Sequence, residues 1–346
     1  MDARPCVRLG REGNLRMLAE MRLCRKVGAV MALLLATVTG QAATCTGEAE
    51  LTPQDHAALS ATISRLTAAV ANQDFATLQA ALLPAEAAEW NGIHGAIELA
   101  GPLLKGGQLQ LRNLYLLDAA SQIAPSDTQF FCSNASGSLT VTITMHALPP
   151  GRYAVVLADA AGAPLAGQLG IILAWDGPES GWRLAGIFVH QGVFDGHDGV
   201  WYWSRGRALA SADPWSAWYS YDAARYLLLP VDFLSSPNLE KLHQEQTQIV
   251  GSPQDAFPYS LKDGDRTWKI DAVLLDPSLH QADLAVVYES AGVTDSAALR
   301  TEAIAVFSAL LKAQPGLRAN FHGLWAYAVK DGKRTPVMEL PMGQIP

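Results

Sequence analysis

The hydrophobic positions after residue 50 recur every three or four residues, as expected for helices. Thr52-Pro53-Gln-Asp55 supplies an N-cap hydroxyl, a proline at the first helical position and an acid in the first turn, which together begin a helix. The apolar residues that follow keep the helical spacing: Leu59, Ile63, Leu66 and Val70. The pattern predicts two further helices, at about 75–83 and 85–104.

After Gly106-Gly107 the apolar period changes from helical spacing to two, which is typical of half-buried strands. Clusters of Gly, Pro, Asn and Ser separate the alternating segments, and such clusters form turns. The predicted strands lie near residues 109–116, 128–133, 138–145, 153–157, 169–175 and 182–190. Helices followed by an antiparallel sheet predict an α+β domain over residues 45–190.

Residues 192–250 have a different, helical character. A first helix is predicted from Asp198 to about Ala212. Asp213-Pro214 begins a second, which Pro230 ends, and a third covers 238–248. We interpret this segment as a helical connector between two domains.

Residues 255–346 form a second α+β unit. Strands are expected at 267–275 and 283–289, followed by a helix at 296–313 with one apolar stripe. Pro315-Gly316 ends that helix, and strands at 322–329 and 335–340 close the chain around a tight turn. The order is therefore β-β-α-β-β, and the fold class of the whole chain is α+β.

Residues 1–42 have the features of a bacterial signal peptide. A basic segment, Met21–Lys26, precedes an apolar run, Val27–Val38, and small residues flank Gln41 as they do at cleavage sites. The run of about 12 residues is shorter than the roughly 20 that span a membrane, so we expect no stable membrane anchor after cleavage. Residues 1–20 contain no apolar run, and Met21 is an alternative start. The expected location is periplasmic or extracellular.

Export changes the interpretation of the cysteines, since two of the four lie before residue 43. Cys45 and Cys132 remain, and an oxidising compartment favours a disulfide between them. The alternative is two buried free thiols. Two cysteines alone do not make a structural zinc site.

The net charge argues against nucleic acid as a partner. The whole chain carries −8, and residues 1–42 hold seven Lys or Arg and three acidic residues. The remainder therefore has 18 basic and 30 acidic residues, a net charge of −12. Phosphate backbones require a basic surface that this composition does not supply.

Two segments resemble known families. Ala68–Phe75, followed by Leu78 and Leu82-Leu-Pro, resembles the opening of the NTF2-like (SnoaL-type) fold, and Gly181–Val189 is similar to its closing strand. The resemblance covers about 50–190 and implies a helix-plus-sheet domain with a pocket between the layers. That family includes enzymes and pure binding domains, so the resemblance does not decide function.

The second resemblance lies at about 199–230. The positions of four residues there resemble the second half of one degenerate tetratricopeptide-like helical hairpin. These residues are Ala217, Tyr221, Ala224 and Pro230. No further copy follows, and repeat arrays generally need at least three copies for stability. This segment is therefore better interpreted as helices packed on their neighbours.

The chain lacks the strong catalytic and nucleotide-binding motifs, including G-x-S-x-G, the P-loop, H-E-x-x-H and G-x-G-x-x-G. The densest polar cluster offers nitrogen and oxygen ligands for a divalent metal: His190, Asp195, His197 and Asp198. The alternative is structural, with Asp195 in a turn, Asp198 as a helix cap and His197 bonded to a backbone carbonyl. No other cofactor is expected.

Two further sets of residues are candidates for binding. Trp90 and His94 share a helix face and, in an NTF2-like domain, would face the pocket. The alternative is a layer interface filled by Leu and Ile. The second set is an aromatic surface on the connector, which at helical spacing also fits a hairpin packed on itself: Trp201, Trp203, Trp215 and Trp218.

These observations favour an exported, non-catalytic binding or assembly module of the periplasm or cell envelope, whose protein or small-molecule partner the sequence does not identify. The alternative is an enzyme that uses the NTF2-like pocket or a metal site at His190–Asp198.

The two interpretations of His190–Asp198 predict different outcomes for one substitution. If the segment is structural, His197→Ala changes neither the metal content of protein purified without chelator nor its Tm. If the segment binds a metal, the substitution should lower both the metal content and the Tm, because it removes one of the ligands. Metal analysis and thermal unfolding of the two proteins distinguish the interpretations.

Overall fold

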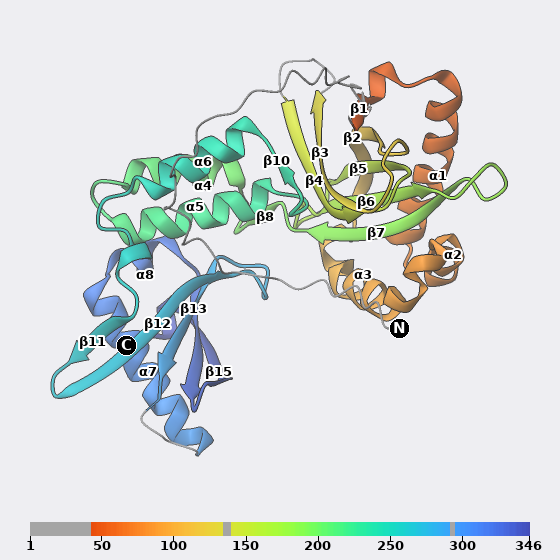
Figure 1. Cartoon of the computed structure of the whole chain (residues 1–346). Helices are drawn as coiled ribbons and strands as arrows, with labels where there is room; N and C mark the ends of the chain where they lie inside the picture. The colour runs from red at the N-terminus through yellow and green to blue at the C-terminus, as the bar shows by residue number, and fades with distance from the viewer. Residues whose placement is uncertain (1–42, 134–139, 291–294) are drawn as a thin grey trace, which may run out of the picture. The chain divides into compact units, whose positions relative to one another are not determined.

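The computed structural model describes residues 43–133, 140–290 and 295–346 (Figure 1). It is a mixed helix-and-sheet structure, which confirms the α+β class. The predicted signal peptide lies outside the described residues. Among the described helices, none is both long and apolar enough to cross a membrane.

Three helices form the first layer: α1 (Pro53–Ala71), α2 (Phe75–Ala81) and α3 (Trp90–Leu104). The Thr52 hydroxyl accepts a hydrogen bond from the Asp55 amide, as the sequence predicts for an N-cap. The expected helix at 85–104 instead starts as a 3-10 segment, η2 (Pro84–Glu89), and becomes α-helical at Trp90. All three helices bury apolar side chains in one cluster with the adjoining sheet.

That sheet is antiparallel, with the order β1-β2-β5-β6-β7. Its strands are β1 (Thr44–Gly47), β2 (Gln108–Asp118), β5 (Arg152–Ala161), β6 (Gln168–Trp175) and β7 (Trp182–His190). Sequence periodicity did not reveal β1, because four residues are too few to establish a period.

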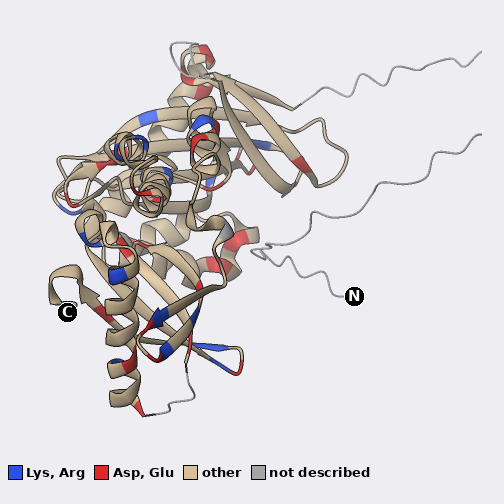
Figure 2. Cartoon of the chain, turned by 90° about the vertical axis from the view of Figure 1, so that its left-hand side faces the viewer, with Lys and Arg blue, Asp and Glu red and all other residues tan. Residues whose placement is uncertain are grey.

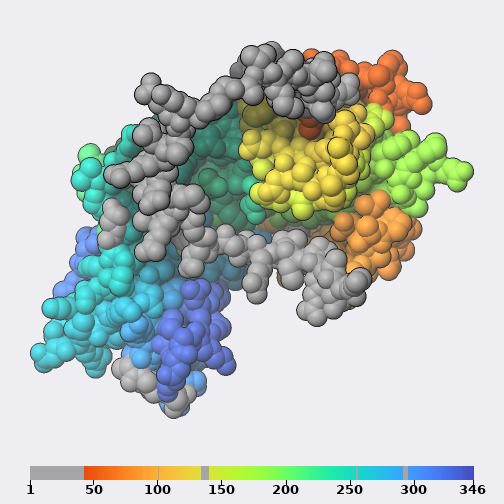
Figure 3. Space-filling model, in the orientation of Figure 1, coloured from red at the N-terminus to blue at the C-terminus, as the bar shows by residue number. Residues whose placement is uncertain are grey.

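The other two predicted strands of this region leave the sheet. β3 (Ser126–Ser133) and β4 (Thr140–Leu148) form a hairpin that pairs with β10 (Leu234–Ser235) in a second sheet. The sequence predicted one antiparallel sheet, and the division into two depends on a pairing between segments about 90 residues apart, which no local pattern encodes. Figure 3 shows this hairpin, in yellow, at the surface of the molecule.

A disulfide joins the two sheets. Cys45 of β1 and Cys132 of β3 are bonded, with their Cα atoms 5.3 Å apart, which confirms the predicted pair. Cys132 is fully buried in the apolar cluster between the sheets, together with Leu117, Phe130 and Ile143. The bond therefore anchors the N-terminal strand to the separate hairpin.

Three helices follow a short hairpin of β8 (Val193–Phe194) and β9 (His197–Asp198). They are α4 (Gly199–Leu209), α5 (Pro214–Leu228) and α6 (Pro237–Thr247), and α5 contacts both of the others. The side chains of Asp198, Asp213 and Ser236 cap their N-termini.

The third sheet has the order β11-β12-β13-β14-β15, and only the β13–β14 pair is parallel. Its strands are β11 (Tyr259–Asp263), β12 (Arg266–Asp276), β13 (Asp283–Glu289), β14 (Gly323–Lys330) and β15 (Lys333–Pro341). Two helices, α7 (Ser296–Ala313) and α8 (Gly316–Asn320), connect β13 to β14. Compared with the predicted β-β-α-β-β order, the structure adds β11 and α8.

Residues of α4–α6 share one hydrophobic cluster with this sheet and with α7. Tyr219, Tyr288 and Phe307 are among its fully buried aromatic members. Of the helices of the predicted connector, α5 makes the direct contact with this sheet, through β12. Lys and Arg lie scattered among Asp and Glu over the ribbon (Figure 2).

Replacing both bonded cysteines tests the contribution of the disulfide. Because the bond closes a chain segment with a sequence separation of 87, its loss enlarges the entropy of the unfolded state. We expect Cys45→Ala/Cys132→Ala to lower the free energy of unfolding by about 2–4 kcal/mol. Urea unfolding of the oxidised wild type and the double variant measures this difference, and equal stabilities would contradict it.

Candidate functional site

Trp90 and His94 lie together on α3, as their spacing predicts. The rings of Trp90 and His94 are 5.8 Å apart, and the His94 ring lies 4.0 Å from that of Phe75. Trp90 packs at the edge of the core between the helices and the sheet, which is filled by buried apolar side chains such as Leu66, Leu78 and Ile97. Neither Trp90 nor His94 lines the two pockets described below.

The residues of the predicted metal cluster do not form a three-ligand group within the described parts of the chain. Asp198 caps α4 through the Trp201 amide at 2.8 Å, and Asp195 adopts a positive φ in the turn before Gly196. His197 stacks on Trp201, with the ring centroids 3.8 Å apart. His190 points elsewhere, into a pocket described below.

The four connector tryptophans have separate environments. Trp201 is 41% exposed, whereas Trp215 is buried against Phe257 and Tyr259. Trp203 donates its indole N–H to Glu245, and Trp218 is partly buried. Of the predicted aromatic surface, Trp201 therefore remains the exposed member.

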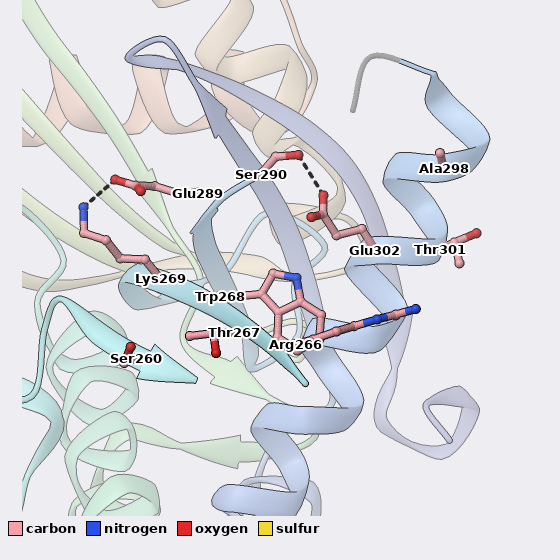
Figure 4. A pocket seen from close by; sticks show the side chains of 10 residues that line it. All are labelled: Ser260, Arg266, Thr267, Trp268, Lys269, Glu289, Ser290, Ala298, Thr301 and Glu302. Carbon is pink, nitrogen blue, oxygen red and sulfur yellow. Dashed lines mark hydrogen bonds and ion pairs between the residues drawn. The ribbon is translucent and has the colours of Figure 1, made fainter. Parts of the chain in front are cut away.

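A pocket of about 770 Å³ lies between β12, β13 and α7 (Figure 4). Three of its four charged side chains already have partners: Lys269 pairs with Glu289, and the Ser290 hydroxyl donates to Glu302 at 2.7 Å, whereas Arg266 is exposed at the rim. A ligand there would have to displace these partners, which weighs against a dedicated polar site.

A smaller pocket of about 430 Å³ brings together three distant parts of the chain. The end of β7, one side of α5 with the loop after it, and β12 all contribute. Its lining combines apolar walls with four charged or titratable side chains and one phenol: Leu229, Leu274, Leu275, His190, Asp222, Arg225, Asp232 and Tyr226. Apolar walls with a few converging polar groups are typical of ligand sites.

His190 carries an unpaired polar atom at this pocket. Its Nδ1 is buried and has no hydrogen-bond partner. The ring lies 5.3 Å from that of Tyr226, which in turn stacks on Phe194. Burial lowers the pKa of His190, and the nearby Asp232 opposes this only in part. The imidazole is therefore neutral at physiological pH, and a ligand can supply the missing hydrogen bond.

Asp222 is the most perturbed group of the pocket. Burial raises the pKa of Asp222 to about 6, although the Gln246 amide donates to its Oδ1 at 2.6 Å and the Arg225 charge favours ionisation. The Gln246 amide is held in turn by the Trp218 carbonyl. A carboxylate that is costly to ionise, placed at a pocket, is a candidate functional group.

The sequence analysis selected His190 only as a candidate metal ligand and did not predict this pocket or the roles of Asp222, Arg225 and Tyr226 in it. Those three share one side of α5 because they are three and four residues apart. The signal in the sequence was a pair of charged residues, Asp222 and Arg225, within the largely apolar helix α5. It carries no information about β12, which completes the pocket from 50 residues further along the chain.

Replacing Asp222 by the isosteric amide should stabilise the protein. The folded state binds the Asp222 proton more tightly than the unfolded state, whose pKa is near 3.8. The free-energy cost of ionising Asp222 in the folded state is therefore absent below about pH 3.8, grows as the pH rises to about 6, and is complete above that pH. We expect Asp222→Asn to raise the free energy of unfolding by up to about 3 kcal/mol at neutral pH, with no gain below about pH 4. Urea unfolding at several pH values measures this, and a gain independent of pH would contradict it.

Comparisons with protein-family models, with curated proteins and with solved structures gave no match for this chain. Its function is therefore argued from the site itself, from the side chains that line the pocket and the groups left without partners.

Proposed function

We propose that the chain is an exported binding protein of the periplasm or cell envelope that holds a small ligand in the pocket lined by His190, Asp222 and Arg225. The Cys45–Cys132 disulfide supports the compartment, since such bonds persist where the environment is oxidising. The observation that carries the binding role is the pocket itself, where a destabilising carboxylate and an unpaired imidazole nitrogen meet apolar walls.

The charges of the pocket favour a zwitterionic ligand with an apolar part. Asp222 and Asp232 offer two carboxylates for an ammonium group, and Arg225 offers a guanidinium for a carboxylate. Leu229 and Leu274 supply apolar contact, and Leu274 is 42% exposed before any ligand binds. A hydrophobic amino acid or short peptide combines these features.

We propose the NTF2-like fold for residues 50–190. Three helices that cover one face of an antiparallel sheet support this assignment. The layer interface is packed with apolar side chains. The pocket lined by His190, Asp222 and Arg225, here called the junction pocket, is therefore the better location for a ligand than the interior of that domain.

Calorimetric titration with the dipeptide Leu-Leu at neutral pH tests the proposal. We expect binding to the wild type, with affinity reduced about tenfold or more in Asp222→Asn and in Arg225→Ala, because each removes one charge-assisted hydrogen bond. Arg65→Ala, an exposed arginine of α1 outside the pocket, is the matched control and should bind as the wild type does. Affinity should also fall as the pH drops below about 6, where Asp222 takes up a proton.

The N-acetylated, C-amidated dipeptide removes both terminal charges but keeps the apolar side chains. If the capped and free dipeptides bind equally, or if neither the free dipeptide nor leucine binds to folded wild-type protein, the zwitterion proposal is wrong.

A further inference from the structure

A second polar group lies in the C-terminal sheet, outside the pocket described above. Asp283 begins β13, His322 immediately precedes β14, and Glu339 lies near the end of β15. The parallel β13–β14 register starts with Leu284 opposite Leu324, which places Asp283 beside Gly323. Glu339 is two residues from Pro341, which pairs with Gly323 on the other side. Three neighbouring strands thus bring the three side chains to one end of the sheet.

The three side chains lie close together. The His322 Nδ1 lies 2.8 Å from the Asp283 Oδ1. One donor atom from each of the three residues lies within 4.8 Å of the donors of the other two. Asp283 is fully buried, whereas the His322 side chain is 35% exposed and connects the group to solvent.

Both carboxylates keep an oxygen without a partner. The Asp283 Oδ2 and the Glu339 Oε1 are buried and have no hydrogen-bond partner of good geometry, and the buried indole N–H of Trp325, the protein donor near Asp283, is likewise unpaired. Buried, unpaired carboxylate oxygens are costly, and native proteins normally satisfy them with a donor, a water or a metal. Two such oxygens beside one imidazole therefore point to a bound species that supplies positive charge.

Gly323 makes room for the two carboxylates. A Cβ atom at this position would lie 2.8 Å from the Glu339 Oε1 and 2.9 Å from the Asp283 Oδ1, both closer than real Cβ contacts allow. Its backbone φ is not in the left-handed region. A Cβ would also lie 2.9 Å from the Leu340 carbonyl oxygen, so the need for glycine is steric: the absence of a side chain admits the neighbouring strand and both carboxylates.

We propose that Asp283, His322 and Glu339 bind one divalent metal ion. One imidazole nitrogen with two carboxylate oxygens is a donor set that suits Zn²⁺, whereas Mg²⁺ and Ca²⁺ prefer oxygen ligands alone. Two ligands about 2.1 Å from one ion are at most about 4.2 Å apart, so small side-chain movements complete the site. With three protein ligands, one position of a tetrahedral ion remains for water or a bound molecule.

The nearest other carboxylate does not belong to this group. Asp276 pairs with Asp283 across β12 and β13, but its two oxygens already accept hydrogen bonds from Ser278 and Tyr327. The contrast supports the assignment, because Asp276 is satisfied by the protein whereas Asp283 and Glu339 are not.

Zinc titration of the full chain tests the inference. The protein, produced without a histidine tag and stripped with chelator, is titrated with Zn²⁺ alone by calorimetry, and Co²⁺ replaces Zn²⁺ for visible absorption. We expect one Zn²⁺ per chain, with affinity reduced at least about tenfold in Glu339→Gln and in His322→Ala, because even residues behind the ligands of metal sites contribute 10–100-fold. Circular dichroism of each stripped variant checks that it folds.

Two control variants keep the outcome specific. Glu289→Gln removes an exposed carboxylate of the same sheet, and His197→Ala removes a member of the group that the sequence suggested. Both should bind Zn²⁺ as the wild type does. The inference is wrong if folded wild-type protein binds no Zn²⁺ at one equivalent, if Glu339→Gln and His322→Ala retain full affinity, or if His197→Ala alone loses it. None of these results depends on the dipeptide, so the two proposals fail or stand separately.

Discussion

Helix α5 is buried along most of its length, and the pocket lined by His190, Asp222 and Arg225 depends on how this helix packs. Ala217, Tyr219 and Ala224 are almost fully buried in the cluster that also contains the C-terminal sheet. The Tyr219 hydroxyl donates to the Val273 carbonyl of β12 at 3.1 Å, so a specific polar contact fixes the helix against the strand. Because α5 and β12 form two walls of the junction pocket, this contact also sets the width of that pocket.

Buried glutamine side chains connect the first sheet and the residue after it to α5 and to the loop between β12 and β13. Gln168 of β6 donates to the Leu227 carbonyl at the end of α5. Gln191, which has no exposed surface, donates to the backbone carbonyl of His280, and its own oxygen lies 3.0 Å from the His280 Nδ1. A buried amide stabilises only the arrangement that satisfies it, so these glutamines select one packing of the segments where apolar contacts alone would accept several.

Local chemistry explains how much of this structure could be predicted from the sequence. Thr52, Asp198 and Asp213 cap the helices that their positions predicted, because capping depends on residues within one turn. The sites depend instead on register. Asp283 and His322 are 39 residues apart and meet only because β13 and β14 pair in parallel around α7. The His190–Asp198 segment looked like a site because its polar residues are close in sequence, but its backbone turns and a helix cap separate them.

The disulfide between β1 and β3 has a consequence for how the protein matures. In the proposed export, which would begin at the N-terminus, Cys45 would cross the membrane 87 residues before its partner Cys132. In a chain that begins after Ala42, these are the only two cysteines, so a single pairing exists. In that proposed mature chain, oxidation cannot select a wrong partner within the chain, so the bond would form with a thiol oxidase and without a disulfide isomerase.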